Sequence, residues 1–194
     1  MFYEPKDGHP LPHNPFNAII TPRPIGWISS RTGAGVDNLA PYSFFNGVSY
    51  APPQVMFAST GQKDSLSNIQ ETGAFCVNIV EYAMRDAMNS SAAGVDANIS
   101  EFELAGVKSA ACETIDCCRV ADAPAALECK MTQIIKLEGD ANFVIFGTVT
   151  GIHLRDDTIV DGRFDVTTFR PLSRLGYRDY SVVDSLFELA RPDD

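Results

Sequence analysis

NLAPYSFFNGVSYAPPQVMFASTGQKDS, residues 38–65, is the stretch of sequence that predicts most about the fold. Its first nine residues combine small, hydroxylated and aromatic side chains, which indicate one irregular loop that ends on Phe44-Phe45-Asn46. Pro52-Pro53 then precedes a short apolar strand over residues 54–59. Lys63-Asp64-Ser65 follows at the expected start of a helix, which Asp64 or Ser65 can cap. The stretch therefore places an aromatic loop, a strand and a helix N-terminus close together in the chain.

Around this stretch, expected strands outnumber expected helices. Residues 25–30 and 36–40 predict a hairpin, and a helix over residues 64–72 ends at Gly73 before a strand over 74–79. Further helices are expected over residues 81–91, 96–104 and 181–190, and long strands over 126–137 and 142–154. Strands do not alternate with helices, so the pattern predicts a mainly β fold: an antiparallel barrel with a few inserted α-helices.

Length and composition predict a single domain. The chain has 194 residues, and no linker, repeat or low-complexity tract divides residues 1–194. Residues 1–15 are rich in Pro and His and are expected to form an extended N-terminal arm.

Charge and hydropathy exclude several classes of partner. The net charge of −10 argues against nucleic acid, because a phosphate backbone requires clustered Lys and Arg. No apolar run reaches the roughly 18 residues that a membrane-spanning helix needs, so no membrane partner is expected. The polar, proline-rich N-terminus lacks the pattern of a secretory signal, and a cytoplasmic protein is predicted.

The five cysteines predict reduced thiols that pack as small apolar side chains. Their number is odd and no CxxC pair occurs. A redox role for Cys112 or Cys117 is the alternative. No His, Cys or Asp cluster has zinc-ligand spacing, so no metal is expected.

An aromatic loop beside a helix N-terminus is typical of a site for a phosphorylated planar cofactor, and a flavin is the one suggested here. The free N–H groups of a first helical turn favour a phosphate. Lys63 adds a positive charge, and the hydroxyls of Ser59 and Ser65 can donate hydrogen bonds. Each feature has a simpler alternative: Phe44-Phe45 can be core residues, and Lys63 can be a solvated surface lysine.

The chain resembles the flavin reductase-like FMN-binding family, which includes flavoredoxin. Each matching motif is weak alone, but the motifs occur in the family's order over roughly residues 17–180. They are Pro22-Arg23-Pro24-Ile25, residues 38–46, Pro52-Pro53, Lys63-Asp64-Ser65 with Asn68-Ile69, residues 71–75 with Val77-Asn78, residues 147–153, and residues 174–177. The family usually carries Thr where this chain has Ser65, so a hydroxyl is retained.

The resemblance implies a split β-barrel of Greek-key-like topology and a homodimer with non-covalent FMN near the subunit interface. It implies reduction of flavin by NADH or NADPH, with electrons passed to an unknown acceptor. The alternative is an FMN-binding electron-transfer module without its own NAD(P)H reaction. A different phosphate cofactor, such as pyridoxal phosphate, remains a third possibility.

The expected FMN site combines the loop, the helix N-terminus and one arginine. Arg23 can reach a phosphate or a nicotinamide nucleotide, or it can form a structural ion pair. His153, at a strand end, is the candidate catalytic residue for positioning a nicotinamide or a proton, and a histidine bound only to a structural partner is the alternative. The predicted cofactor-binding residues are Arg23, Asn38, Pro41, Tyr42, Ser43, Phe44, Phe45, Asn46, Ser59, Lys63 and Ser65.

Overall fold

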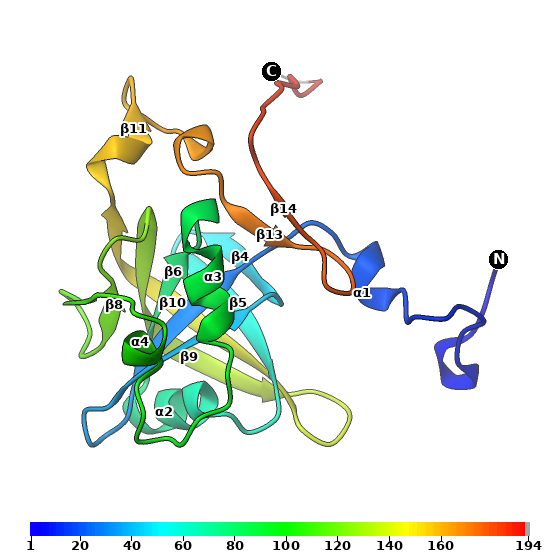
Figure 1. The fold of residues 1–194 in the computed structure, drawn as a ribbon, viewed down its shortest axis with the longest axis horizontal. Coiled ribbons are helices and arrows are strands. Elements are labelled where there is room, and N and C mark those ends of the chain that lie inside the picture. Colours follow the sequence, from blue (N-terminus) through cyan, green and yellow to red (C-terminus); the bar gives the residue numbers. More distant parts are fainter. Residues whose placement is uncertain (193–194) are drawn as a thin grey trace.

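The computed structural model describes residues 1–192 and is built around one seven-stranded antiparallel sheet (Figure 1). Its strands are β2 (Gly26–Arg31), β3 (Asp37–Tyr42), β4 (Phe45–Tyr50), β5 (Pro53–Thr60), β6 (Ala74–Ile79), β9 (Ala125–Lys136) and β10 (Asn142–Leu154), in the order β3-β2-β6-β9-β10-β5-β4. Strands β3 and β4 lie at opposite edges, yet only Ser43 and Phe44 connect them. Three Cα–Cα steps span at most about 11 Å, so the sheet must curl until its two edges approach each other. The result is a split β-barrel.

Several predicted elements are confirmed. Strands β2 and β3 form the expected hairpin, with Gly26 opposite Tyr42 and Arg31 opposite Asp37. Helix α2 (Asp64–Thr72) occupies the predicted residues, and β6 follows it directly. Gly73 ends the helix with φ of 70°, a left-handed conformation that costs glycine little.

Two local predictions in residues 38–65 are wrong. The expected irregular loop is instead the end of β3, a two-residue connection and the start of β4, where Phe45 and Asn46 lie. Pro41 fits a strand here because β3 is an edge strand, where a missing N–H breaks no ladder. The expected helix cap is also absent, because Lys63 is the N-cap and no side chain caps the turn.

The predicted closing helix over residues 181–190 is wrong as well. Residues Tyr180–Val182 form strand β14, which pairs with β13 (Leu172–Arg174), and β13 pairs with β1 (Arg23–Pro24). The expected helix over residues 81–91 is a 3-10 turn, η2 (Tyr82–Met84), followed by α3 (Arg85–Ser90), and that over 96–104 shortens to α4 (Glu101–Leu104). The other elements are η1 (Pro5–Asp7), α1 (Phe16–Ile19), β7 (Ser109–Ala111), β8 (Cys118–Val120), η3 (Asp156–Thr158), β11 (Ile159–Val160), β12 (Arg163–Phe164) and η4 (Val166–Thr168).

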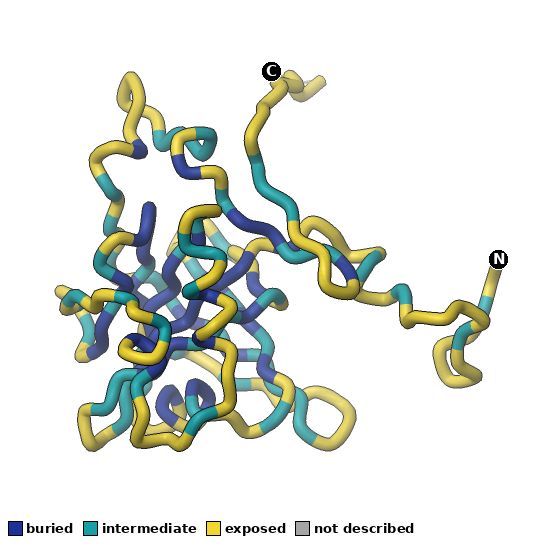
Figure 2. The backbone as a smooth tube through the Cα atoms, viewed as in Figure 1, coloured by how far each residue is buried: buried dark blue, intermediate teal, exposed yellow. Residues whose placement is uncertain are grey.

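The main core fills the barrel and is closed at one end by α2 (Figure 2). Leu66 and Ile69 on one face of α2 are fully buried there. Inside the barrel the rings of Tyr42 and Phe57 lie 4.8 Å apart, and those of Phe57 and Phe75 lie 5.5 Å apart, both in tilted or edge arrangements. Tightly packed aromatic rings therefore fix the wall of the barrel next to α2.

A second core cluster lies outside the barrel wall, beneath α3 and α4. Its centre is Trp27, whose side chain is fully buried. Trp27 Nε1 donates a 2.8 Å hydrogen bond to Ser91 Oγ, just after the end of α3. Trp27 is thus a core residue, and the hydrogen bond connects the end of α3 to β2.

The two terminal segments extend away from the barrel (Figure 1). Residues 1–15 are almost entirely exposed, in agreement with the predicted arm. Both segments carry exposed apolar side chains, which include Phe2, Phe16, Ile19, Phe187 and Leu189. No helix within residues 1–192 combines the length and apolar character needed to cross a membrane.

The five cysteines are free thiols, as expected from the sequence. Cys76, Cys117, Cys118 and Cys129 are buried, and Cys112 is partly exposed. Burial contributes to raising the pKa of Cys129 well above its usual range, so this thiol stays protonated.

Candidate functional site

Three cavities lie in a row. On one side they are bounded by α3 and the residues that follow it, and on the other side by the edge strands β3 and β14. The first, of about 310 Å³, is lined at the N-terminus of α2 and is called the helix cavity. The second, of about 340 Å³, contains Arg23 and Arg174 and is called the arginine cavity. The third, of about 410 Å³, contains Tyr82 and Tyr180 and is called the tyrosine cavity.

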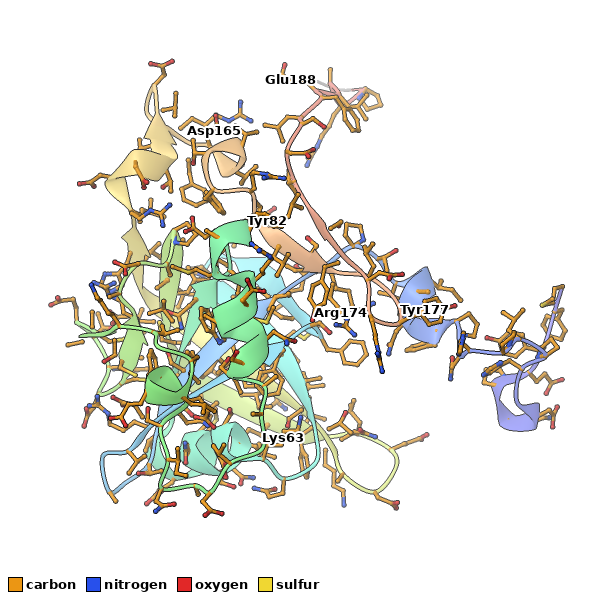
Figure 3. All side chains as sticks on the ribbon, viewed as in Figure 1. Lys63, Tyr82, Asp165, Arg174, Tyr177 and Glu188 are labelled. Atoms are coloured by element: carbon orange, nitrogen blue, oxygen red, sulfur yellow. The ribbon has the colours of Figure 1, made fainter. Side chains whose placement is uncertain are left out.

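Shared walls make the three cavities neighbours. Pro41 and Ala92 line both the helix cavity and the arginine cavity. Met88, Asn89 and Tyr180 line both the arginine cavity and the tyrosine cavity. Figure 3 shows the same order, with Lys63 beside α2, Arg174 in the middle and Tyr82 at the far end of α3.

The helix cavity has a positive end. Lys63 stands at the N-cap of α2, and its Nζ lies 5.8 Å from the centroid of the Tyr42 ring. Among the described residues, no carboxylate forms an ion pair with Lys63. Because no side chain caps α2, its first-turn N–H groups also face this end without a side-chain acceptor. Together they form an end of the cavity that suits an anion, and the carboxylates of Asp64 and Glu101 also line the cavity.

Tyr42 adds an unsatisfied polar atom to the same cavity. Its hydroxyl is buried and, among the described residues, makes no hydrogen bond of good geometry, although Ser59 and Ser65 are near. Burial raises the pKa of Tyr42, so the hydroxyl stays protonated and can donate. A buried donor without a partner costs free energy, which an acceptor on a ligand in the helix cavity would recover.

Asn38 holds the back of the helix cavity through a buried polar network. Its Oδ1 accepts a 2.8 Å hydrogen bond from Ser65 Oγ, and its Nδ2 lies 3.0 Å from both carboxylate oxygens of Glu101. Glu101 also accepts from the backbone N–H of Leu39 at 3.0 Å, and burial raises its pKa. The side chains of Asn38 and Ser65 are therefore hydrogen-bonded to each other. Glu101 was not predicted, because only the fold brings α4 against β3.

The arginine cavity holds two guanidinium groups with no ion pair among the described residues. Arg23 is only 6% exposed and donates to the backbone carbonyls of Ile20 at 2.6 Å and Leu175 at 2.8 Å, and to that of Asn17. Burial and the nearby Arg174 lower the pKa of Arg23. Its Nε has no hydrogen-bond partner within the described part of the chain. The predicted alternative of a structural ion pair for Arg23 is therefore wrong, since carbonyl groups anchor it.

The predicted residues divide between these cavities, the core and the exposed surface. Asn38, Tyr42, Lys63 and Ser65 line the helix cavity, Arg23 and Ser43 line the arginine cavity, and Pro41 lines both. Phe44, Phe45, Asn46 and Ser59 line neither cavity. Phe45 belongs to the barrel core, Ser59 Oγ donates to the carbonyl of Gly61 at 3.1 Å, and Asn46 Oδ1 accepts from the N–H of Gly47. The ring of Phe44 lies 5.7 Å from the Arg23 guanidinium carbon.

His153 lies outside all three cavities. Its Nε2 is 2.5 Å from Oε1 of Glu128, a fully buried residue of β9. Glu128 also accepts hydrogen bonds from the backbone N–H groups of Glu113 and Thr114 and from the Thr114 hydroxyl. His153 thus has a hydrogen-bond partner, Glu128, but it does not line the cavity that contains Arg23 and Arg174. Within residues 1–192 no group of three or more His, Cys, Asp or Glu side chains is arranged to hold a metal ion.

The geometry suits a long ligand with an anionic end. The helix cavity offers a lysine, helix N–H groups and an unsatisfied hydroxyl, and the adjoining arginine cavity offers a proline wall, a serine and two cations. A planar polar ring linked to a phosphate has this distribution of charge and shape. The residues present therefore fit a phosphorylated planar cofactor.

The chain is similar to known proteins in both sequence and fold. The family model described as flavin reductase like domain matches residues 19–170. An uncharacterized protein of Halalkalibacterium halodurans is 34% identical over 184 residues, which cover 89% of this chain and 87% of the relative. Nitrilotriacetate monooxygenase component B from Bacillus cereus has a similar structure, with a TM-score of 0.91 and 30% identity over 97% of this chain and 98% of that one. The 2-nitrobenzoate 2-nitroreductase of Pseudomonas fluorescens has a TM-score of 0.83 and 33% identity over 91% and 88% of the two chains.

Proposed function

The chain belongs to the flavin reductase-like domain family, and from this premise we propose that it is an FMN-dependent oxidoreductase that takes hydride from NADH or NADPH. Electrons would pass to free flavin or to another acceptor. The family match supports a flavin-linked redox role. The observation that carries the proposal for FMN is the continuity of the helix cavity and the arginine cavity through Pro41 and Ala92.

The helix cavity is the proposed phosphate end of the site. Lys63 and the first-turn N–H groups of α2 would hold the phosphate, which carries nearly two negative charges at neutral pH. Asp64, the first residue of α2, also lines this cavity, so its carboxylate would have to turn away from a bound phosphate. Asn38 positions the Ser65 side chain behind this end.

The wall from Pro41 to Ser43 is the proposed ring end. It leads from the helix cavity into the arginine cavity, where Arg23 can stabilise negative charge on a reduced ring. When bound, FMN would itself supply the hydride-accepting chemistry. The protein's tasks are then to bind, to orient and to exclude water, and neither cavity requires a catalytic histidine. We accordingly leave His153 out of the proposed mechanism.

The proposal is tested by the visible spectrum of the purified protein and by a coupled assay. We expect a flavin spectrum, either as purified or after addition of FMN, and oxidation of NADH or NADPH that depends on FMN. Riboflavin, which lacks the phosphate, should bind more weakly than FMN. Failure to take up FMN would contradict the proposal. A pyridoxal phosphate spectrum would point to the other cofactor.

The same assay separates the enzyme from an electron-transfer module. The two similar structures named above carry different activities in their names, a monooxygenase component and a nitroreductase, so the family match leaves the acceptor open. Bound FMN that dithionite reduces but NADH and NADPH do not would favour the electron-transfer alternative.

We further infer that the protein acts as a homodimer. The arm of residues 1–15 is largely exposed and lies away from the barrel (Figure 2), and the apolar side chains of Phe16 and Ile19 that follow it are exposed. A second copy would bury them. Light scattering coupled to gel filtration should give twice the mass of the chain, and a monomer at micromolar concentration would contradict the inference.

A further inference from the structure

The arginine cavity is lined by a row of three side chains that one small sheet brings together. In the sheet β1-β13-β14, Arg23 lies opposite Arg174, and Arg174 lies opposite Tyr180. Residues directly opposite each other on antiparallel strands share one face of the sheet, and all three of these residues line the arginine cavity. The strand pairing therefore sets two guanidinium groups, the arginine pair of Arg23 and Arg174, next to each other at this cavity.

The arginine pair is unfavourable in the absence of an anion. Like charges directly opposite each other destabilise a sheet, and burial together with Arg174 lowers the pKa of Arg23. Arg23 is almost completely buried, and its three hydrogen bonds go to neutral backbone carbonyls, which do not cancel its charge. Its Nε has no hydrogen-bond partner within the described residues. A buried cation without a counter-ion costs free energy, which an anion bound beside it would offset.

No acidic side chain compensates the arginine pair. Within residues 1–192, no carboxylate lines the arginine cavity, and no ion pair includes Arg23 or Arg174. The chain as a whole carries 25 acidic and 15 basic residues, so two adjacent cations without an acidic neighbour run against its composition. A local positive charge of this kind favours an anionic ligand.

Arg174 is the member of the pair that a ligand can contact directly. It is partly exposed, and its guanidinium carbon lies 4.6 Å from the centroid of the Tyr180 ring, so a cation–π contact holds the group in place. Within the described part of the chain, its guanidinium group makes one hydrogen bond, from Nη2 to the backbone carbonyl of Tyr177. Its other N–H groups are available to the oxygens of a carboxylate or a phosphate.

Bound FMN would leave the arginine pair without a counter-ion. In the proposed orientation, the phosphate of FMN lies at the N-terminus of α2, and the oxidised ring, which is uncharged, faces the arginine cavity. The compensating anion must then belong to another molecule. The molecule that has to lie beside the flavin ring is the one that exchanges hydride or electrons with it.

We propose that the arginine pair binds the anionic group, a carboxylate or a phosphate, of the second substrate of the flavin site. Arg174 would donate hydrogen bonds to the oxygens of this group, and Arg23 would supply a fixed, buried positive charge beside it. The reacting part of the substrate would then lie against the ring end of the flavin. The assignment to a second substrate rests on the proposed function, whereas binding of an anion at the arginine pair can be measured without FMN.

Calorimetric titration of the full-length protein, with and without FMN, tests this inference with two probes. Benzoate and phenyl phosphate carry a carboxylate and a phosphate on the same ring, so they distinguish the two sources of negative charge. We expect at least one probe to bind in both conditions, and Arg174→Ala to weaken its binding roughly 10- to 100-fold. Arg174→Lys keeps the charge without the planar donor group, so it should bind the probe more tightly than Arg174→Ala. Benzyl alcohol, which is uncharged, should bind all variants alike.

Arg178→Ala is the matched control. Arg178 is an exposed arginine in the turn between β13 and β14, and it lines none of the three cavities. Its removal takes the same charge from the same hairpin and should leave probe binding unchanged. Arg23 is left intact in every variant, because its side chain anchors three backbone carbonyls and its loss would disturb the fold.

Three results would overturn the inference. They are absence of binding by both probes at millimolar concentration, equal probe binding by Arg174→Ala and the parent protein, and displacement of a bound probe by FMN. The last result would mean that the cofactor itself fills the arginine cavity. Failure of the protein to take up FMN, while a probe still binds and Arg174→Ala weakens that binding, contradicts the proposed function alone.

Discussion

Lys63 stands where most helices carry a capping Ser, Thr, Asp or Asn. It is the N-cap of α2 with extended backbone angles, and its side chain forms no cap. A lysine at this position adds a cation to the positive end of the helix dipole, which opposes stability in the absence of an anion. The choice of residue makes physical sense if an anion occupies the helix cavity.

Lys63→Ala should weaken FMN binding by roughly 1.5–3 kcal/mol, the contribution of a hydrogen bond to a charged group. The free energy of unfolding of the flavin-free protein should not fall, because no cap is lost and a cation is removed from the positive end of the helix. A flavin fluorescence titration measures the affinity, and Lys136→Ala, an exposed lysine at the end of β9, is the control. Unchanged affinity in Lys63→Ala would show that the phosphate has another anchor.

Glu128 has a structural role that can be read from the pH dependence of stability. Burial alone would raise the pKa of Glu128, but hydrogen bonds from Thr114, His153 and the backbone N–H of Glu113 lower it to about 2, from an ordinary 4.5. The folded protein therefore favours the carboxylate. This contribution is complete above pH 4.5 and is lost as the pH falls toward 2.

Glu128→Gln should lower the free energy of unfolding at pH 7 by roughly 1–3 kcal/mol, since an amide cannot accept all four hydrogen bonds. The loss of stability on acidification below pH 4.5 should also be shallower than in the parent protein. Urea unfolding over a pH series measures both effects, with the exposed Glu138→Gln as control. Identical pH profiles for Glu128→Gln and the parent would contradict the assignment.

Helix α2 depends on its C-terminal glycine as well as on its buried face. Gly73→Ala should lower the free energy of unfolding by about 1–2 kcal/mol, the cost of a side chain in the left-handed region. No atom lies within 4 Å of the added Cβ, so the effect would come from the backbone alone. Gly47→Ala, in β4, is the control, because it meets no atom within 4 Å and its φ lies outside the left-handed region. Equal urea midpoints for the two variants would contradict this explanation.

Elements with strong local signals were predictable from the sequence. Helix α2 combines an apolar face at Leu66 and Ile69 with a glycine stop, and β10 is long and rich in β-branched residues. The prediction of a closing helix over residues 181–190 was wrong because β14 pairs with β13, and this tertiary contact overrides the local periodicity of the sequence. Strand β3 was missed in part because Pro41 reads as a loop residue until the edge position is known.

At the scale of the whole molecule, barrel closure decides what the sequence could reveal of the site. Lys63, Asn38 and Pro41 were predictable from motifs close together in the chain. Glu101 and Arg174 were not, because they reach the cavities from segments far away in sequence. Phe45 was predicted to bind the cofactor. Because the chain passes from β3 to β4 across the split in the barrel, its side chain lies in the barrel core.

Removal of residues 1–15 tests the role of the arm. The barrel core contains none of these residues, so the truncated protein should keep its far-ultraviolet circular dichroism spectrum. We expect the dimer to dissociate at higher concentration than the full-length dimer, because apolar contact area is lost. Sedimentation velocity over a dilution series measures this, and an unchanged dissociation constant would contradict a role of the arm in the interface.

The hydrogen bond between Trp27 and Ser91 gives the molecule an internal optical reporter. Trp27 is the sole tryptophan of the chain, and Ser91, its partner, lines the helix cavity. Excitation energy absorbed by this indole would be transferred to a flavin-like chromophore bound in the helix cavity. The fluorescence of Trp27 would therefore decrease in proportion to the occupancy of the cavity. Filling of the pocket can thus be followed in real time, without a dye or a label.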